Sequence, residues 1–369
     1  MAAMTITVAT NQQEWDAFLL RQPHRPFLQS WAMGEVYRRI GQEPIRLMAK
    51  DGDTVRGVCF AHVVPARRGR HLSVPYGPVV EMENGKWKME NIEELMTELK
   101  RIARDKQCSF IRMSPFWVRT PESDTQLKSI GAKHSPLHLL AEHLWYLPLT
   151  SPDPWLPIPS PSPSPIHMTE DDLFKNMRST TRNLIRRAQK EGVTVTASAD
   201  PVADIEHFLS LHEVTRKRHG FTPYTNTFFR AQVEEFAKTN NVILYLARHQ
   251  GQVIASSIHM TFGGETSYHH GASVISKIPA SYLLQWTAIQ DAMKRGDHVY
   301  NFWGIAPRRM ENGEWKIENA KHPFAGVTLF KTGFGGNLLE LIHCIDLPLS
   351  ARYYITRGFE MLRKWRRGF

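Results

Sequence analysis

Residues 151–165 read Ser-Pro-Asp-Pro-Trp-Leu-Pro-Ile-Pro-Ser-Pro-Ser-Pro-Ser-Pro and divide the 369-residue chain into two parts of comparable size. Proline fixes φ and has no N–H, so this run cannot join a helix or the middle of a sheet. Its composition predicts an extended spacer without a core of its own. A chain of this length suits two domains. We therefore expect an N-terminal domain over 1–150, a linker over 151–165 and a C-terminal domain over 166–369.

The two parts repeat one order of elements. Each contains a polar turn, an apolar strand, a helical pattern and a second buried strand, at residues 51–53, 55–64, 92–105 and 109–113 in the first part and 250–252, 253–261, 281–295 and 298–302 in the second. This order predicts a duplicated α/β (α+β) unit with a mixed, mostly antiparallel sheet. An acyl-CoA N-acyltransferase (GNAT) fold has the same order, and we expect two such domains in tandem.

Composition narrows the class of protein and its partners. The formal net charge of +10 favours an anionic partner, either a nucleic acid, an anionic lipid or a phosphorylated substrate. The three cysteines are far apart and lack metal-ligand spacing, which fits a reducing cytosol and predicts no metal site. Neither an apolar run of about 18 residues nor a basic flank followed by an apolar run at the N-terminus is present. We expect a cytoplasmic protein.

The segment after the linker is strongly basic. Thr169 and the following acidic residues predict a helix start, and Gly192 predicts its end after Glu191. Lys175, Arg178, Arg182, Arg186 and Lys190 are three or four residues apart and would share one face. Because no acidic residue lies between Leu173 and Lys190, this face favours contact with a phosphate-bearing partner. The alternative is a merely solvated face.

Two other segments concentrate positive charge. Arg216-Lys217-Arg218-His219 is followed by glycine and aromatic residues up to Tyr224, which favours a ligand-approached loop over a helix end. Arginine suits bidentate recognition of phosphate. Residues 352–369 combine arginines and lysine with aromatic side chains. Such a helix can lie in a membrane interface, bind nucleic acid, or pack its aromatic side chains on the body of the protein. The sequence does not decide between these three alternatives.

A series of short motifs runs collinearly along almost the whole chain. They are Phe27–Trp31, Val74–Val80, Phe110–Pro115, Met177–Ala188, Tyr282–Trp286, Tyr300–Ile305 and Gly326–Gly336. The last, Gly-Val-Thr-Leu-Phe-Lys-Thr-Gly-Phe-Gly-Gly, is the most specific. In this order the motifs resemble the Fem family (FemABX) of non-ribosomal peptidyltransferases.

The resemblance implies an enzyme of cell-wall synthesis that builds the interpeptide bridge of peptidoglycan. It implies an aminoacyl-tRNA donor, a UDP-linked or lipid-linked muropeptide acceptor, no cofactor, and peripheral association with the inner membrane face. By the same resemblance, Arg178, Arg182, Arg186 and Lys190 would contact tRNA phosphates. The resemblance also implies that Arg218 contacts the diphosphate of the acceptor. It places Tyr224, Tyr268, Trp31 and Arg38 along the substrate groove, and Phe330 and Lys331 beside the transferring ester.

Lys331 is the best catalytic candidate on chemical grounds. Attack of an amine on an ester develops negative charge on the carbonyl oxygen, and one well-aimed donor there contributes roughly 3 kcal/mol. We expect Lys331, between Phe330 and the glycines that follow, to supply this charge; the alternative is a lysine in a glycine-rich turn facing water. No general base is assigned. His259, His269 and His270 titrate in a useful range, but histidines on strands are typical of satisfied core positions.

Two rival functions stay open. The first is an acyl-CoA N-acyltransferase acting on a small amine or a sugar. Its pyrophosphate loop normally presents glycines and backbone N–H groups, whereas residues 276–281 contain no glycine and include Pro279. The second is a non-catalytic protein that binds tRNA or a membrane through the basic segments. That reading explains the charge but leaves the motif around Lys331 without a role.

Overall fold

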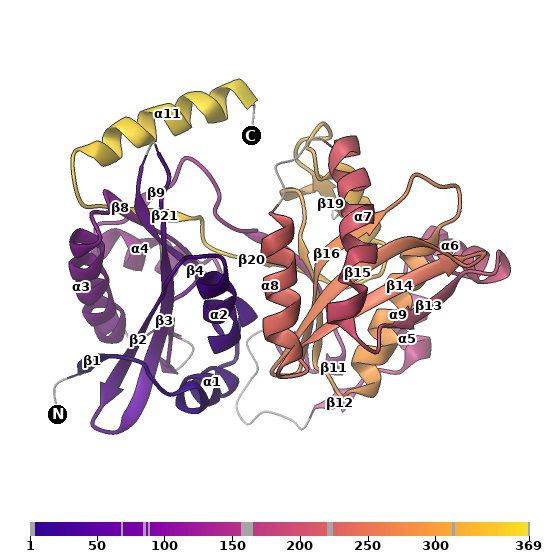
Figure 1. The fold of residues 1–369 in the computed structure, drawn as a ribbon, viewed down its shortest axis with the longest axis horizontal. Helices are drawn as coiled ribbons and strands as arrows, with labels where there is room; N and C mark the ends of the chain where they lie inside the picture. The colour runs from indigo at the N-terminus through magenta and orange to yellow at the C-terminus, as the bar shows by residue number, and fades with distance from the viewer. Residues whose placement is uncertain are drawn as a thin grey trace. The chain divides into compact units, whose positions relative to one another are not determined.

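The computed structural model describes residues 4–67, 69–83, 86–87, 89–155, 165–219, 224–311 and 314–367. The chain forms two compact units (Figure 1). Unit 1 comprises Met1–Glu142 together with Glu340–Phe369, and unit 2 comprises His143–Leu339. Within the described residues, no helix is both long enough and apolar enough to cross a membrane.

Unit 1 is built on an eight-stranded sheet. Along the sheet lie β1 (Thr5–Val8), β2 (Pro44–Asp51), β3 (Thr54–Val64), β4 (His71–Tyr76), β8 (Phe110–Pro115), β21 (Ile345–Pro348) and β9 (Lys133–His134), while β5 (Val79–Val80) pairs with β3. Among the described strands of this sheet, only β4 and β8 pair in parallel. The helices are α1 (Gln12–Leu20), α2 (Trp31–Arg39), α3 (Met89–Asp105), α4 (Pro121–Ser129) and α11 (Arg352–Arg367), with a short hairpin of β6 (Met82–Glu83) and β7 (Lys86–Trp87).

Unit 2 repeats this plan with a seven-stranded sheet. Its order is β13 (Thr194–Ala197), β14 (Val242–His249), β15 (Gln252–Phe262), β16 (Glu265–Ser273), β17 (Val299–Gly304), β10 (His143–Pro148) and β20 (Asn337–Glu340). The helices are α5 (Glu170–Asn176), α6 (Ser179–Lys190), α7 (Pro201–His219), α8 (Asn226–Ala237), α9 (Ala280–Lys294) and α10 (Ala325–Thr332). Two small ribbons pair β11 (Thr150–Ser151) with β12 (Ile166–His167) and β18 (Arg308–Glu311) with β19 (Glu314–Ile317).

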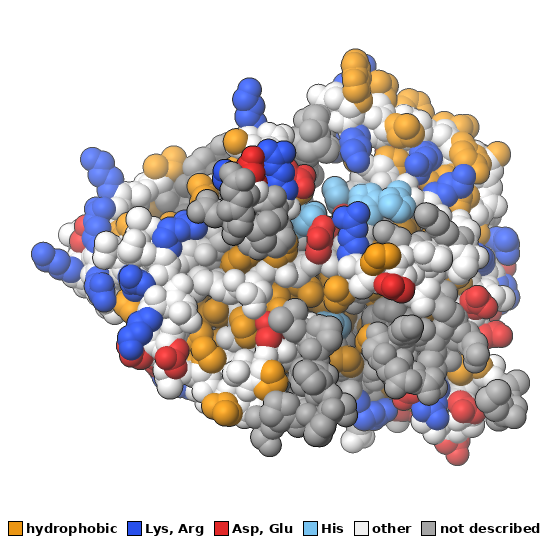
Figure 2. Space-filling view, turned by 180° about the vertical axis from the view of Figure 1, so that it is seen from behind, with side chains coloured by type: hydrophobic (Ala, Val, Ile, Leu, Met, Phe, Trp, Pro, Cys, Tyr) orange, Lys and Arg blue, Asp and Glu red, His pale blue; other side chains and the backbone are white. Residues whose placement is uncertain are grey.

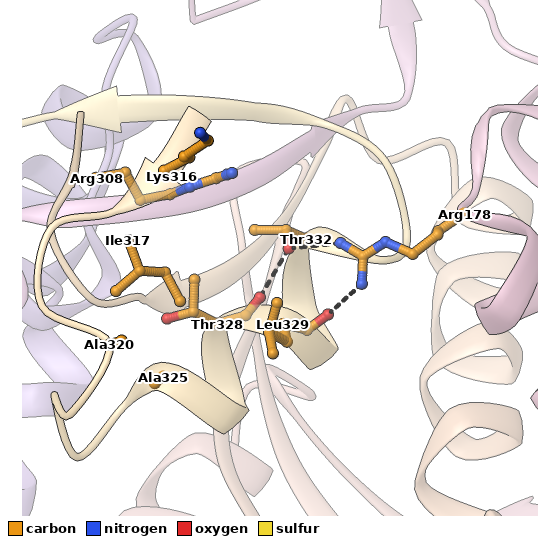
Figure 3. A pocket seen from close by; sticks show the side chains of 9 residues that line it. All are labelled: Arg178, Arg308, Lys316, Ile317, Ala320, Ala325, Thr328, Leu329 and Thr332. Carbon is orange, nitrogen blue, oxygen red and sulfur yellow. Dashed lines mark hydrogen bonds between the residues drawn. The ribbon is translucent and has the colours of Figure 1, made fainter. Parts of the chain in front are cut away.

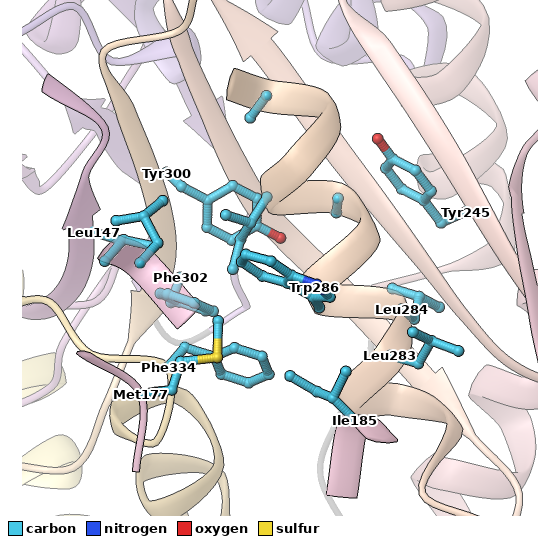
Figure 4. Packing of buried hydrophobic residues seen from close by; sticks show 14 of the residues in the cluster. Leu147, Met177, Ile185, Tyr245, Leu283, Leu284, Trp286, Tyr300, Phe302 and Phe334 are labelled. Atoms are coloured by element: carbon cyan, nitrogen blue, oxygen red, sulfur yellow. The ribbon is translucent and has the colours of Figure 1, made fainter. Parts of the chain in front are cut away.

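The two sheets share one pattern, which confirms the predicted duplication. In each, an antiparallel run leads to one parallel pair, β4 with β8 or β16 with β17, followed by an antiparallel strand. In unit 2 the core forms because α9 places Leu284, Ala288 and Ala292 four residues apart on one buried face. This face packs with Tyr300 and other apolar side chains in one cluster (Figure 4).

The chain divides at different points from those predicted. Residues 143–148, expected in the first domain, form β10 beside β17 in unit 2. Residues 345–348, expected in the second, form β21 between β8 and β9 in unit 1, and α11 follows them there. A strand's own residues reveal its extended conformation but not which sheet it joins, since pairing is non-local. The segment 156–164 of the predicted linker lies outside the described residues.

Two local predictions are also corrected. Thr169 caps a helix as expected, but α5 ends at Asn176 and α6 starts at Ser179, so residues 169–191 are not one helix. The break is fixed by tertiary contacts: Met177 is buried, and the N–H of Arg178 donates to the carbonyl of Gly333 at 2.9 Å. The basic segment 216–219 is the last turn of α7 rather than a loop. There Arg216 forms a 2.7 Å ion pair with Glu213 one turn earlier.

Candidate active site

Unit 2 opens where its two parallel strands separate. Strands β16 and β17 are paired only at their beginnings, from Glu265↔Val299 to Ser267↔Asn301. Beyond these three pairs, the described residues of the two strands form no further pairing with each other. The equivalent strands of unit 1 are paired over six successive residues, from His71↔Phe110 to Tyr76↔Pro115. The opening is therefore a feature of the second unit.

A β-bulge in β16 lies at the start of this opening. Tyr268 pairs with His259 and His270 pairs with Ile258, so that His269 is the extra residue. Bulges re-aim side chains and are common beside active sites. Here the ring of His269 lies 4.8 Å from that of Trp303, edge to face. The bulge thus brings a side chain of β16 against the end of β17.

The end of β17 is shaped by Asn301. Its side-chain amide donates to Glu265 at 2.9 Å, and Ser267 donates to the same carboxylate oxygen at 2.7 Å, which ties the last paired residues together. The side-chain oxygen of Asn301 accepts the N–H of Trp303 at 2.8 Å. Trp303 adopts a φ of 68°, a conformation that side chains other than glycine rarely take. This turn precedes the carbonyl of Gly304.

Lys331 is directed at that carbonyl. Its Nζ donates to the oxygen of Gly304 at 2.7 Å and lies 5.7 Å from the ring centre of Tyr268. The side chain belongs to the last turn of α10 and is buried, so it does not face water. Desolvation lowers the pKa of Lys331 to about 7. The lysine is therefore a buried amine that changes its charge near neutral pH.

Neighbours in the motif hold α10 in place. The ring of Phe330 packs against Tyr282 at 4.9 Å and against Phe334 at 5.4 Å. After the helix, Gly336 has a φ of 101°, and a Cβ there would overlap the carbonyl oxygen of Tyr146 on β10. Glycine is needed because the chain passes so close to the neighbouring backbone. Phe330 and Gly336 therefore fix where Lys331 lies.

The three histidines named from the sequence differ in their surroundings. His259 bonds to the Tyr300 hydroxyl at 2.7 Å, and that hydroxyl donates to Gln285 at 2.6 Å, so His259 is a satisfied core residue. Burial lowers its pKa to about 3. Burial and the nearby charge of Lys331 likewise lower the pKa of His269 to about 3. His270 packs against aromatic rings, and burial lowers its pKa as well.

A cationic cavity of about 420 Å³ adjoins the same helix (Figure 3). Its lining contains three basic side chains and no acidic one: Arg178, Arg308, Lys316, Ile317, Ala320, Ala325, Thr328, Leu329 and Thr332. Arg178 is tied to α10 by hydrogen bonds to the carbonyl of Leu329 (3.2 Å) and the hydroxyl of Thr332 (3.3 Å). Burial and the charge of Arg178 lower the pKa of Arg308. The cavity suits an anion.

The other basic residues predicted to contact phosphate have structural partners or lie at a helix end. Arg182 donates to the carbonyls of Lys175 and Met177, both at 2.6 Å, and so caps the end of α5. The guanidinium of Arg186 lies 5.1 Å from the ring centre of Phe174. Lys190 is exposed at the end of α6. Of the four predicted phosphate contacts, Arg178 is the one that lines the cavity.

The predicted acceptor residues are dispersed. Tyr268 lies beside Lys331, as described above. Tyr224 is half exposed and stacks on Phe228 at 4.4 Å. Arg218 is in the last turn of α7, but its side chain lies outside the described part of the structure.

Trp31 and Arg38 belong to unit 1. The guanidinium of Arg46 lies 3.8 Å from the ring centre of Trp31. Arg38 forms ion pairs with Glu35 at 2.5 Å and with Glu43 at 3.0 Å. The positive charge of Arg38 is thus already balanced by two carboxylates within its own unit.

Comparison with known proteins agrees with this architecture. Residues 10–139 match the FemAB family, and residues 175–316 match an acetyltransferase (GNAT) domain. A crystal structure of FemX superimposes with a TM-score of 0.76 at 18% identity, covering 96% of this chain and 100% of that one. Residues 10–139 thus belong to the FemAB family, and the relatives named below extend the likeness over almost the whole chain. The predicted fold of two GNAT-like domains is thereby confirmed.

Two named Fem relatives come from Staphylococcus epidermidis. An aminoacyltransferase FemA is 21% identical over 440 residues, covering 95% of this chain and 98% of the relative. A lipid II:glycine glycyltransferase is 22% identical over 254 residues, which cover 68% of this chain. The match spans only 57% of the length of the glycyltransferase.

Several residues around the site were not singled out from the sequence. Trp303 lies in the motif Tyr300–Ile305. Asn301, two residues before it, was the signal in the sequence that the strand could end in a turn. Arg308 and Lys316 lie on either side of the dipeptide Asn312-Gly313 in the sequence, and a predicted hairpin between two basic residues was a weak signal for a shared cavity. His269 could not be identified as a bulge residue, because a bulge is defined by the partner strand.

Proposed function

We propose that this protein transfers an amino acid from aminoacyl-tRNA to an amine of a peptidoglycan precursor, on the inner side of the cytoplasmic membrane. The observation that carries the proposal is the buried amine of Lys331, held at the opening between β16 and β17. The names of the relatives support the reaction class, since one is an aminoacyltransferase and another acts on lipid II. The acceptor would be a UDP-linked or lipid-linked muropeptide.

In the proposed reaction the acceptor amine is the nucleophile, and the protein supplies a positive charge. The acceptor amine attacks the ester carbonyl, a C–N bond forms, and the ester C–O bond breaks. The proton lost by the amine ends on the leaving ribose oxygen. Protonated Lys331 would stabilise the oxyanion of the tetrahedral intermediate, and a well-placed donor of this kind contributes roughly 3 kcal/mol. Phe330 would act by positioning, because its ring holds α10 against Tyr282.

The cationic cavity is the proposed contact for the donor. A tRNA end carries phosphates next to its ester, and arginine and lysine neutralise phosphates in a salt-dependent way. Arg178, Arg308 and Lys316 line the cavity, and Arg178 bonds to Thr332, the residue after Lys331. Helix α10 therefore carries the proposed catalytic amine and also lines the cavity that would hold the phosphates. Arg182, Arg186 and Lys190 stay proposed as peripheral contacts to the tRNA.

The acceptor residues are proposed from the family resemblance together with the new geometry. Tyr268 lies beside Lys331 and would line the groove next to the ester. Arg218 would contact a diphosphate, and half-exposed Tyr224 would line the outer part of the groove. Trp31 and Arg38 are proposed contacts from unit 1. No cofactor takes part in this scheme.

The test is incubation of the protein with a pool of charged tRNAs and a muropeptide precursor, followed by mass analysis of the product. The expected result is the mass increment of one or more amino acids, lost in a Lys331→Ala variant that keeps its far-UV circular dichroism. A product without any increment, together with micromolar binding of acetyl-CoA, would favour the acyl-CoA reading instead. Binding of tRNA without transfer to either UDP-linked or lipid-linked acceptors would favour a non-catalytic protein.

A further inference from the structure

Helix α11 is attached to unit 1 mainly through polar contacts. Glu360 forms a 2.7 Å ion pair with Arg112 of β8, and Arg357 donates to the carbonyl of His134 at 2.7 Å. Thr356 is buried against Gly69, where a Cβ would lie 2.5 Å from the threonine hydroxyl. Tyr353 is the one large ring of the helix that is fully buried among the described residues. The inward side is therefore defined by residues 353, 356, 357 and 360.

The opposite side of α11 is apolar and exposed. Its large apolar residues keep between 44% and 79% of their surface in solvent: Tyr354, Ile355, Phe359, Met361, Leu362 and Trp365. At 3.6 residues per turn these positions fall within one arc of roughly 160° that faces away from Thr356 and Glu360. A surface helix normally turns its apolar stripe to the core. In α11 this arrangement is reversed.

Positive charge borders the exposed apolar arc. Arg352, Arg363 and Arg366 lie along one edge of it, and Lys364 lies beyond the opposite edge; all four are exposed. Among the described residues of α11 the one acidic side chain is Glu360, which Arg112 neutralises. Figure 2 shows hydrophobic and basic side chains gathered together over α11, at the upper right of that face. Contiguous apolar surface with a charged border marks an interaction site.

We propose that α11 docks the protein on an anionic lipid bilayer, with Ile355, Leu362 and Trp365 entering the boundary between headgroups and acyl chains. A helix with a large apolar face and basic borders lies in the plane of such an interface, and each basic residue near an anionic surface adds about 1 kcal/mol of attraction. Nucleic acid fits less well, because aliphatic residues such as Ile355 and Met361 cannot stack on bases as aromatic platforms do.

This inference deepens the proposed function, on which it rests only for the choice of acceptor. An enzyme held at the bilayer by α11 would meet a lipid-linked acceptor in the plane of the membrane. A UDP-linked acceptor is soluble and would be used equally well without α11 docking. Loss of membrane binding should therefore reduce transfer to the lipid-linked precursor in vesicles and leave transfer to the soluble precursor unchanged.

The test is co-sedimentation of the full chain with vesicles of phosphatidylcholine alone or mixed with phosphatidylglycerol. We expect binding to the mixed vesicles, weakened by salt, and a loss of at least about tenfold in affinity for the variant Ile355→Ser/Leu362→Ser/Trp365→Ser. Reversing charge with Arg363→Glu/Lys364→Glu should have a similar effect. The matched control is Ile275→Ser, which removes a comparably exposed side chain from unit 2. Unchanged circular dichroism and thermal midpoint confirm that the variants are folded.

Three outcomes would overturn the proposal. The wild-type chain does not sediment with anionic vesicles, or the triple variant still does. The triple variant loses binding to tRNA rather than to vesicles, which would make α11 a nucleic-acid contact. The wild-type chain is a dimer in sedimentation velocity and the triple variant a monomer, which would make the apolar arc an interface between copies. If neither acceptor is used by the wild type while vesicle binding persists, the proposed function fails and the docking helix stands.

Discussion

The Nζ of Lys331 donates to the carbonyl oxygen of Gly304 at 2.7 Å, in a buried position at the open end of β17. A neutral carbonyl stabilises an ammonium ion less than a carboxylate does, and no carboxylate of the described residues forms an ion pair with this lysine. The cost of burying the charge is therefore only partly offset, and the pKa of Lys331 falls to about 7.

We expect the activity to depend on pH through Lys331. If the protonated amine stabilises the oxyanion, the increase in kcat/KM that Lys331 provides falls about tenfold for each pH unit above its pKa of about 7. The Lys331→Arg variant stays charged throughout this range, so the ratio of wild-type to variant kcat/KM removes the titration of the acceptor amine. That ratio should decline from pH 7 to pH 9. A ratio that rises instead would assign the neutral amine as a general base.

Replacing Lys331 by methionine should abolish transfer and stabilise the fold. The folded-state pKa of Lys331 lies below its ordinary value, so the native state binds fewer protons than the unfolded chain between about pH 7 and pH 10.4. The free-energy cost of burying the charged amine is therefore fully present below pH 7, and it vanishes above pH 10.4, where the lysine is neutral in both states. Lys331→Met should accordingly raise the free energy of unfolding most at pH 6, measured in urea by circular dichroism. A variant that is less stable than wild type at pH 6 would contradict this account of the pKa.

The cavity predicts a salt-dependent contact with tRNA. Arg308→Ala and Lys316→Ala should each weaken binding of aminoacyl-tRNA and reduce the slope of log affinity against log salt by about 1. Lys294→Ala is the control, since this exposed lysine at the end of α9 does not line the cavity. Filter binding over a series of salt concentrations gives the slopes. Equal slopes for wild type, both cavity variants and the control would remove the cavity from the donor site.

Two glycines of the most specific motif should respond in opposite directions. Gly336→Ala forces a Cβ onto the Tyr146 carbonyl at a φ of 101°, and we expect a loss of about 2–3 kcal/mol in the free energy of unfolding. Gly326 lies inside α10 with open space around its Cβ position, so Gly326→Ala should stabilise by about 0.5–1 kcal/mol through helix propensity. Urea unfolding of both variants provides the comparison. Similar effects for the two glycines would disprove the packing argument.

His343 should make unit 1 less stable as the pH rises. Burial opposes its charge, but hydrogen bonds to Glu142 (2.8 Å) and to the carbonyl of Ser135 (2.9 Å) raise its pKa. The free energy that protonated His343 adds to folding stability is fully present below its ordinary pKa of about 6.5. It is lost as the pH rises through the pKa of the folded state. In the His343→Gln variant, the free energy of unfolding should no longer fall through this residue between pH 6 and pH 9. The control variant His249→Gln, in unit 2, should keep the fall seen in the wild type. A wild-type stability that does not fall over this range would refute the ion pair.

Local signals in the sequence predicted the strands and the helix that repeat in both units. The helix over 281–295 and the strands over 253–261 and 298–302 appear within one or two residues of their predicted bounds, because apolar periodicity and turn residues are local features. The proposal of Lys331 as the catalytic residue came from the family resemblance and from the chemistry of its motif. Its burial did not follow, since the residues around it come from β16 and β17, far away in sequence.

What the sequence could not provide was pairing between distant segments. The helix predicted over 169–191 is broken because Arg178 bonds to Gly333, more than 150 residues later, and no local pattern contains that contact. The same holds for the cavity, whose three cations come from Arg178, Arg308 and Lys316. The single basic face predicted over 175–190 is divided for the same reason, because α5 ends at Asn176 and Arg182 caps its end.

The placement of β21 sets an order of events during synthesis of the chain. Unit 2 is one continuous segment, and its sheet does not depend on any residue that follows β20. Unit 1 begins first but lacks the strand between β8 and β9 until Ile345–Pro348 emerge. The N-terminal segment must therefore wait, with an open sheet edge, for the second unit to be translated. During that wait the edge of β8 is exposed to pairing with other chains, so slow translation after residue 142 should favour aggregation over folding.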